Sequence, residues 1–291
     1  MATPDVKQVV TRRATTEDGA ICGDICYRAF TAINREHNFP PDFPHAGIAI
    51  GFLTMLFGSP GFYCVVAEMD GRVVGSNAMD ERSRIMGIGP VTVDPEIQNA
   101  GVGRELMRVA MDRAQQRGAA GVRLVQAAFH NRSLSLYTKL GFDVREPLSC
   151  VQGQPLRQSV PGYEVRPAEP GDLEGCNEVA REVHGFARSG ELEAGMQSGT
   201  ARVVERVGRI TGYTSDLGFF GHTVTESNAD LQALIASADA FSGPGILVPS
   251  RNTSLLRWCL SNGLRVTQPM TLMSMGLYNE PAGAWLPSVL F

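Results

Sequence analysis

The sequence lacks any apolar run long enough to cross a bilayer, because the apolar stretch at residues 48–57 is shorter than the roughly 20 residues that a spanning helix needs. It also lacks a dense cluster of lysine and arginine, and its formal net charge is -4. Its first residues do not combine a basic segment with an apolar one, as a secretory signal would. These absences predict a cytoplasmic protein that binds neither nucleic acid nor membranes.

Cysteine is scarce and carries no recognisable metal or redox motif. Six cysteines occur, and none forms a C-x-x-C pair. Cys22 and Cys26 lie one helical turn apart, but no further Cys or His lies near them in the sequence to complete a ligand set. We therefore expect reduced, buried thiols and no metal site.

The composition is that of a globular protein with a large core. Apolar residues make up 43% of the chain and charged residues 19%. A chain of 291 residues exceeds one typical domain, so one large or two medium domains are expected.

Hydrophobic periodicity in the first half predicts alternating strands and helices. A helix is expected to start at residues 15–18, and an Asp70-Gly71 turn joins two of the strands. Strands are expected at residues 9–14, 63–69, 73–79, 84–93, 122–128 and 142–151, and further helices at 45–57, 102–117 and 133–140.

The pattern begins again after residues 152–162, a segment rich in Gln, Gly and Pro that is typical of a linker. The spacing of Arg12, Asp18 and Cys22 recurs at a constant offset in Arg166, Asp172 and Cys176. Later, residues 252–263 resemble residues 131–141. Their order on either side of the linker predicts a duplicated fold.

One loop carries a recognisable chemistry, the segment Gln98-Asn99-Ala100-Gly101-Val102-Gly103, which follows a strand and opens a long helix. The first N–H groups of a helix have no partner within the helix and carry partial positive charge. Two glycines let an anionic pyrophosphate approach these groups closely. A Walker loop is excluded because no Gly-Lys-Ser/Thr follows, whereas a tight turn without a ligand stays open.

The first half resembles the GNAT superfamily of N-acyltransferases. The matching residues are Val91-Thr92-Val93-Asp94-Pro95, the loop at residues 98–103, and Asn131-x5-Tyr137-x3-Gly141-Phe142. The resemblance implies an α/β (α+β) fold with two GNAT-like domains, each a mixed, mostly antiparallel sheet flanked by helices. The domains would span residues 1–151 and 163–291.

The same resemblance implies a site for acetyl-CoA between the strand near Val91 and the strand at residues 122–128. Asn131 would contact the pantetheine arm near the thioester, and Tyr137 would protonate the departing thiolate. The residues implied to bind acetyl-CoA are Val91, Thr92, Val93, Gln98, Asn99, Ala100, Gly101, Val102, Gly103, Arg104 and Asn131. From the residues alone, a core role for Tyr137 beside Leu136 and Leu140 stays open.

The base that deprotonates the acceptor is not evident, because the strand before the loop has no carboxylate. Asp80, Glu81 and ordered water remain candidates, and His130 is a weaker one. The segment containing Glu36 and Asp42 would lie on the acceptor side in this fold, or is simply a Pro-rich loop between helices.

The second half loses the cofactor signals. Residues 221–228 contain no Q-x-x-G-x-G, Glu226 lies where phosphates would bind, and the tyrosine position falls at Trp258 or Cys259. This domain is expected to be degenerate, leaving one acetyl-CoA per chain. The sequence thus predicts an N-acetyltransferase that moves an acetyl group directly to a primary amine of a small molecule. A CoA-binding regulatory protein without turnover, a protein or peptide N-acetyltransferase, and a homodimer stay open.

Overall fold

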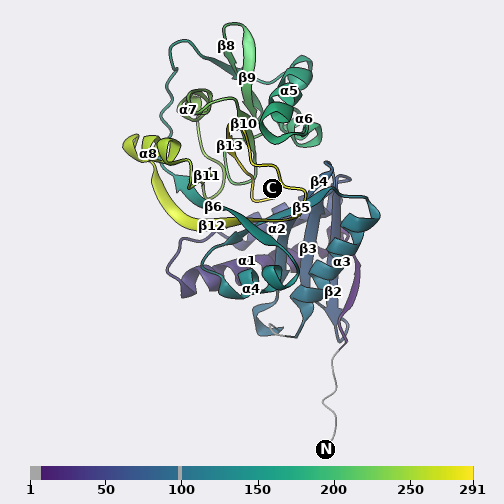
Figure 1. Ribbon diagram of the computed structural model, residues 1–291. Coiled ribbons are helices and arrows are strands. Elements are labelled where there is room, and N and C mark those ends of the chain that lie inside the picture. Colours follow the sequence, from purple (N-terminus) through teal and green to yellow (C-terminus); the bar gives the residue numbers. More distant parts are fainter. Residues whose placement is uncertain (1–7, 98–99, 291) are drawn as a thin grey trace, which may run out of the picture. The chain divides into compact units, whose positions relative to one another are not determined.

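The computed structural model describes residues 8–97 and 100–290, and the chain forms two compact units (Figure 1). Unit 1 is Met1–Ala120 and unit 2 is Gly121–Phe291.

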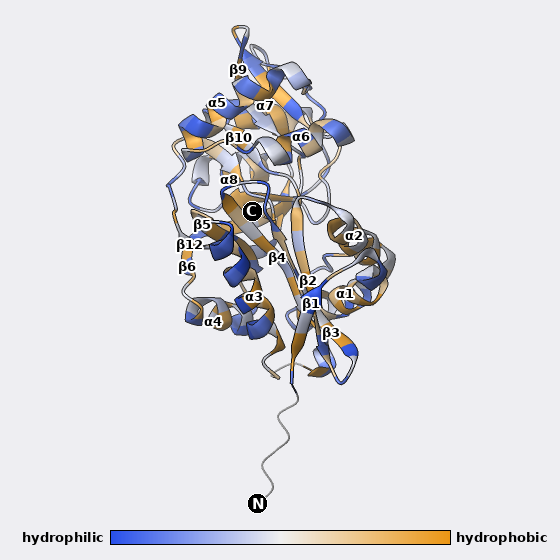
Figure 2. Cartoon of the chain, turned by 90° about the vertical axis from the view of Figure 1, so that its right-hand side faces the viewer, coloured by the Kyte–Doolittle hydropathy of each residue, from blue (hydrophilic) through white to orange (hydrophobic). Residues whose placement is uncertain are grey.

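Unit 1 is an antiparallel sheet in the order β1-β2-β3-β4 with helices on both faces. Figure 2 shows α3 on one face of these strands and α1 and α2 on the other. The elements are β1 (Val10–Arg13), α1 (Gly19–Glu36), α2 (Ala46–Gly58), β2 (Phe62–Met69), β3 (Arg72–Asp80), β4 (Ile85–Val93) and α3 (Val102–Gln116), with short 3-10 turns at Thr16–Asp18 and Pro95–Ile97.

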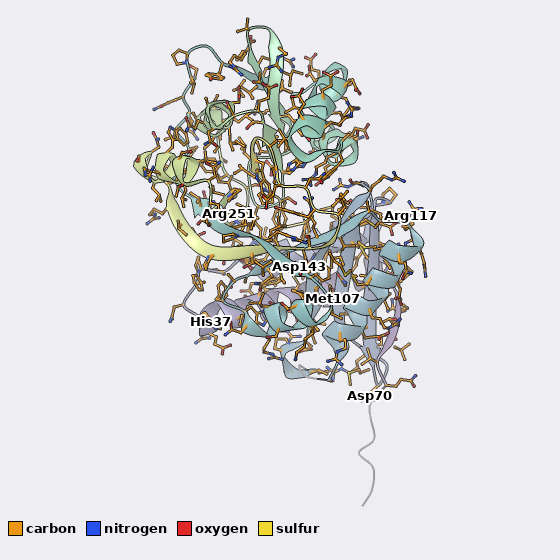
Figure 3. The ribbon with its side chains drawn as sticks, in the orientation of Figure 1. His37, Asp70, Met107, Arg117, Asp143 and Arg251 are labelled. Atoms are coloured by element: carbon orange, nitrogen blue, oxygen red, sulfur yellow. The ribbon has the colours of Figure 1, made fainter. Side chains whose placement is uncertain are left out.

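The elements of unit 1 agree with the expected ones to within a few residues. The turn at Asp70 and Gly71 joins β2 to β3, and both residues have positive φ, 51° and 72° (Figure 3). This is the backbone conformation that a two-residue hairpin requires. Apolar residues of the sheet and of α3, such as Val65, Val74 and Leu106, pack together in a buried core.

Unit 2 contains two sheets. One has the order β5-β12-β6-β11 and the other β13-β10-β9-β8-β7. The elements are β5 (Gly121–Ala127), α4 (Asn131–Lys139), β6 (Asp143–Gln152), β7 (Glu164–Pro167), a 3-10 turn (Pro170–Asp172), α5 (Leu173–His184), α6 (Ser189–Ser198), β8 (Arg202–Arg206), β9 (Arg209–Thr214), β10 (Thr223–Thr225), α7 (Asn228–Ser237), β11 (Ile246–Pro249), α8 (Thr253–Ser261), β12 (Arg265–Gly276) and β13 (Ala284–Leu286).

The two expected copies exchange their last strands within unit 2. Strand β12 of the second copy lies between β5 and β6 of the first, and β6 pairs in turn with β11 of the second copy. Equivalent positions, Leu148 and Met270, face each other in the β6–β12 pair. Residues 121–152 therefore group with the second half. The predicted domain limits, residues 1–151 and 163–291, follow the sequence repeat and differ from the limits of the two compact units. They stay a prediction.

The repeated sequence motif forms the same local structure twice. Arg12 donates two hydrogen bonds of 2.8 Å to Asp18, and Arg166 donates two of 2.7 Å to Asp172. Each aspartate also closes a capping box at the start of a 3-10 turn. Cys22 and Cys176 are both fully buried on the helix that follows. The duplication of the fold is thus visible in its contacts as well as in its sequence.

All six cysteines are buried and unbridged. Burial raises the pKa of the Cys22 thiol to about 12, so this thiol stays protonated and unreactive. Within residues 8–97 and 100–290, no group of three His, Cys, Asp or Glu side chains is placed to hold a metal ion. No helix in the described part of the chain is long and apolar enough to cross a membrane.

Candidate acyl-CoA site

The predicted site residues are divided between the two units. Unit 1 holds the β4 residues Val91, Thr92 and Val93 and the loop that leads into α3. Unit 2 holds Asn131 and Tyr137 on α4. Gln98 and Asn99 lie outside the described residues, so their predicted contacts remain predictions.

The N-terminus of α3 has the form that an anion site needs. Gly101 precedes the helix with φ 82°, and its carbonyl accepts the N–H of Glu105 at 3.1 Å. The regular helical bonds therefore begin there, and the N–H groups of Val102, Gly103 and Arg104 have no acceptor inside the helix. Partial positive charge gathers at this end of α3.

Gly101 is required by its backbone and not by crowding. A side chain at this position would meet none of the described atoms within 4 Å. Its positive φ, however, is a conformation that residues with a side chain rarely adopt. A bulky acidic side chain at Gly101 would therefore introduce strain, bulk and negative charge at the start of α3.

The turn between β4 and α3 is anchored by an ion pair that the sequence did not reveal. Asp94, at the end of β4, is buried and accepts hydrogen bonds of 3.0 and 3.1 Å from Arg28 of α1. Oδ1 of Asp94 also accepts the backbone N–H of Glu96 at 3.1 Å. The Arg28 guanidinium holds the pKa of Asp94 below its usual value. This pair fixes the direction in which the chain leaves the strand.

The β4 residues expected to contact the pantetheine arm alternate in their surroundings. Thr92 is buried, and its hydroxyl lies 3.1 Å from that of Ser76 on β3. Val91 and Val93 are half-buried. The β3–β4 register shifts between Asn77 and Met79, beside the cis Gly89-Pro90 bond. Within unit 1, β4 is the last strand of the sheet, so one of its backbone edges is not used by unit 1.

Tyr137 lies in the buried face of α4, where it packs edge-on against Phe142 with ring centroids 6.3 Å apart. Burial raises the pKa of Tyr137 to about 12. The hydroxyl therefore keeps its proton throughout the neutral range and remains a donor.

Asn131 begins α4 and is exposed. Its carbonyl accepts the hydroxyl of Ser135 at 2.8 Å. Tyr137 follows Asn131 by six positions, which corresponds to about 9 Å along a helix and to a different face. The two side chains would therefore serve different parts of one extended ligand.

The two carboxylates considered as bases are both engaged by arginines. Asp80 accepts hydrogen bonds of 2.9 and 3.1 Å from Nε of Arg82. Glu81 accepts bonds of 2.5 and 2.9 Å from Arg113. Each carboxylate is therefore the anionic partner of an arginine within the protein. Neither group gains support as a base from these contacts.

The loop between α1 and α2 contains the residues that the sequence places on the acceptor side or in a structural connection. Phe43 is buried there, with its ring 6.2 Å from that of Phe30 and 6.3 Å from that of Phe52. The ring of His37 bonds to the carbonyl of Ile33 at 3.0 Å. Phe43 therefore holds the two helices together, which agrees with the structural interpretation of this segment.

The corresponding helix of the second copy, α7, is closed by its own side chains. Ser227 accepts the N–H of Asp230, and buried Asp230 accepts the hydroxyl of Thr211 at 2.6 Å. Glu226 pairs with Arg209 beside them. Carboxylates thus lie where the first copy has Gly101, which makes this end of α7 unfavourable for a phosphate.

The start of α8, the counterpart of α4, is also used internally. The Asn252 side chain accepts the N–H of Leu255 and donates to Asn228 at 2.7 Å. Cys259, at one of the two positions equivalent to Tyr137, is fully buried.

Residues 27–142 match the model of the Acetyltransferase (GNAT) family. The similarity to this family covers the strand, the loop and the α4 residues described above.

A curated relative, an uncharacterized N-acetyltransferase of Methanocaldococcus jannaschii, is 30% identical over 93 residues. The aligned part is 30% of this chain and 40% of the relative, so the chain spans less than half the length of that relative.

Two solved structures share the fold over nearly the whole chain. A candidate acetyltransferase from Pyrococcus horikoshii has a TM-score of 0.74 at 19% identity, covering 98% of this chain and 95% of its own. A tandem GNAT protein from the clavulanic acid biosynthesis pathway has a TM-score of 0.56 at 15% identity, covering 97% and 100%. At these identities the likeness concerns the fold alone, and that fold is a tandem GNAT arrangement.

Proposed function

We propose that the protein is an N-acetyltransferase that transfers an acetyl group from acetyl-CoA directly to a primary amine of a small molecule. The observation that carries the proposal is the N-terminus of α3, where Gly101 has a positive φ and the first N–H groups have no acceptor inside the helix, in a region that matches the GNAT family model. An anionic pyrophosphate fits such a helix end without a metal or a basic side chain.

Binding would be shared among the predicted residues. The backbone N–H groups of residues 99–104 would hold the pyrophosphate, with the side chains of Gln98 and Arg104 as the predicted further contacts. The backbone of Val91 and Val93 pairs with the pantetheine arm as a further strand would. Asn131 holds the arm near the thioester. Chemistry at this bond needs only positioning and proton transfer.

The transfer itself conserves protons. The amine nitrogen attacks the thioester carbonyl carbon, a C–N bond forms and the C–S bond breaks. Sulfur gains one proton, which Tyr137 donates, and nitrogen loses one, which returns to Tyr137 through water. Because burial keeps Tyr137 protonated, the donor is present before the thiolate departs.

One observation favours the alternative of a CoA-binding regulatory protein without turnover. Asp80 and Glu81, the carboxylates considered as bases, are held by arginines, so deprotonation of the amine falls to water. A protein that binds acetyl-CoA and never consumes it would have no need of a base.

The deciding experiment measures free-thiol release from acetyl-CoA across a library of primary amines, with mass spectrometry of the products. Release together with a product heavier by one acetyl group is expected for at least one small amine. Tight acetyl-CoA binding without release for any amine would replace the enzyme by the regulatory protein.

A further inference from the structure

Unit 2 contains a cluster of aromatic and basic side chains that the acyl-CoA site does not use. It gathers side chains from β5, from the last residue of α5 and the segment after it, from the residue before Asn279, and from β13. The guanidinium carbon of Arg123 lies 5.0 Å from the ring centre of Tyr278 and 5.5 Å from that of Phe186. The rings of Phe186 and Trp285 flank His184, at 5.9 and 5.6 Å. We name Arg123, His184, Phe186, Tyr278 and Trp285 the aromatic-basic cluster.

Two members of the cluster bury polar atoms that the protein does not satisfy. His184 is 1% exposed. Both ring nitrogens of His184 lack a hydrogen-bond partner among residues 8–97 and 100–290. The buried hydroxyl of Tyr278 also has none within these residues. An unmet buried donor or acceptor costs roughly 1–3 kcal/mol, so such groups are normally paired with a protein group, a water molecule or a ligand.

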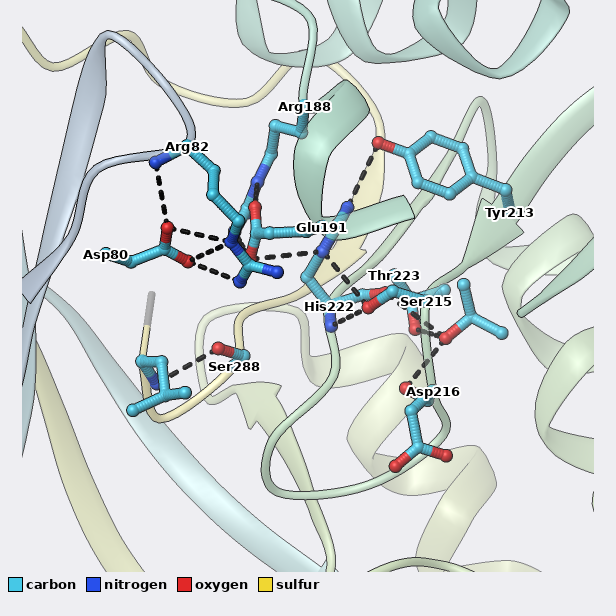
Figure 4. Close-up of polar contacts among 12 residues, drawn as sticks. Asp80, Arg82, Arg188, Glu191, Tyr213, Ser215, Asp216, His222, Thr223 and Ser288 are labelled. Atoms are coloured by element: carbon cyan, nitrogen blue, oxygen red, sulfur yellow. Dashed lines mark hydrogen bonds and ion pairs between the residues drawn. The ribbon is translucent and has the colours of Figure 1, made fainter. Parts of the chain in front are cut away.

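The second buried histidine of unit 2 provides an internal comparison. His222 is fully buried, and its ring nitrogens lie 3.2 Å from the Ser215 hydroxyl and 3.1 Å from that of Tyr213 (Figure 4). Glu191 lies 3.5 Å from the same ring and receives two bonds of 2.6 Å from Arg188. The network around His222 is complete, whereas that around His184 is not.

The electrostatic surroundings of His184 favour an anion. Burial and the nearby charges of Arg188 and Arg123 hold the pKa of His184 well below its usual value, so the ring is neutral and offers one N–H. Burial raises the pKa of Tyr278, which therefore keeps its O–H as a donor. The nearby carboxylates are already committed, Glu191 to Arg188 and Glu146 to Arg251. Donors and a buried guanidinium together suit an acceptor-rich, negatively charged ligand.

We propose that Arg123, His184 and Tyr278 bind the carboxylate of a small organic acid, with Phe186 and Trp285 against its apolar part. A cation is excluded by the guanidinium, and a carboxylate supplies acceptors for both the imidazole N–H and the phenol O–H. Where the acid is an amino acid, its amine is the acyl acceptor. This role of the ligand rests on the proposed function. A free acid without an amine would act as an effector.

The test uses isothermal titration calorimetry on the full chain, with the twenty amino acids, benzoate and phenylacetate as probes. Each acid is compared with its carboxamide, which has the same shape without the charge. At least one acid is expected to bind, with its amide weaker by tenfold or more. If no acid binds more tightly than its amide, the carboxylate site is refuted.

Two variants show whether binding occurs at the cluster. Tyr278→Phe removes one hydroxyl and is expected to weaken the acid about tenfold. Tyr163→Phe, which removes a hydroxyl elsewhere in unit 2, should leave affinity unchanged. His184→Leu should abolish binding while leaving the unfolding temperature the same or higher, because it replaces an unsatisfied polar ring. Wild-type affinity in both Tyr278→Phe and His184→Leu would overturn the assignment.

The acetylation assay distinguishes an acid that is the acyl acceptor from an acid that is an effector. It also distinguishes failure of the carboxylate site from failure of the proposed acetyltransferase function. Acetylation of the bound amino acid identifies it as the acceptor, whereas an acid that changes the rate without being acetylated is an effector. Amides acetylated as well as their acids would refute the carboxylate site and leave the enzyme intact. If acids bind but the protein acetylates no amine, the carboxylate site is supported and the proposed enzyme function is refuted.

Discussion

Tyr137 and Gly101 show how single residues can be interpreted through their surroundings. Tyr137 packs on Phe142 as a core residue does, yet its burial also keeps it protonated, which a proton donor requires. Gly101 has a positive φ and empty space where a side chain would be. In each case the structural requirement and the proposed chemical role are compatible.

Tyr137→Phe should lower kcat by about 100-fold and change KM little, because the proton is needed as the C–S bond breaks. Steady-state kinetics with the best amine of the library measures both constants. Thr138→Val, which removes the hydroxyl of the next residue, an exposed one on α4, is the matched control. An unchanged kcat in Tyr137→Phe would remove the proton-donor role.

The pKa of Tyr137 also predicts a pH profile. Because burial raises it from 10.0 to about 12, the protonated form persists across the range in which an exposed tyrosine ionises. The contribution of Tyr137 to kcat is therefore expected to be constant from pH 7 to pH 10. A loss of rate centred near pH 10 that is absent from Tyr137→Phe would contradict the buried, protonated state.

Among elements, the turn from β4 to α3 depends on a contact distant in sequence. Arg28 and Asp94 are 66 residues apart, and their pairing orients the start of the loop. The pKa of Asp94 is lowered, so its stabilising effect is present above the ordinary aspartate value and is lost as pH falls below it.

Asp94→Asn is expected to lower the free energy of unfolding at pH 7 by about 1–2 kcal/mol and to weaken acetyl-CoA binding. Its stability should also depend less on pH between 5 and 3 than that of the wild type. Asp24→Asn removes the exposed partner of the same arginine and should have little effect. Urea unfolding at several pH values checks this, and equal losses in the two variants would refute the anchoring role of Asp94.

Local patterns predicted these elements well, but not their long-range pairing. The Asp70-Gly71 turn, the α3 periodicity and the repeated Arg-Asp pair each depend on residues close in sequence. The placement of β12 between β5 and β6 joins segments more than 100 residues apart, and its apolar alternation fits several neighbours equally well. The sequence did not reveal the aromatic-basic cluster either, because its members come from segments that are distant in sequence.

At the scale of the whole molecule, the exchange of β6 and β12 makes the two copies depend on each other. Strand β6 of the first copy pairs with β12 and β11 of the second, and β12 of the second copy pairs with β5 and β6 of the first. The copies are therefore not expected to fold separately, although the sequence repeat suggests two domains.

The fragment of residues 1–151 should be unstable or aggregated when expressed alone, because β5 and β6 lose β12 and expose their edges. The full chain cleaved by a protease site inserted within residues 152–162 should stay associated. Size-exclusion chromatography and circular dichroism measure both. A monomeric 1–151 fragment that unfolds at the temperature of the full chain would show that the exchange is dispensable.

The central claim is that the N-terminus of α3 binds acetyl-CoA, and calorimetry tests it most directly. One acetyl-CoA should bind per chain, because α7 is closed by Ser227 and Asp230. Gly101→Glu should abolish binding through bulk and charge. Gly118→Glu, at a position with a similar φ of 65° and equally open space beyond the other end of α3, should retain it. Unchanged acetyl-CoA affinity in Gly101→Glu, or two molecules bound per wild-type chain, would contradict the account.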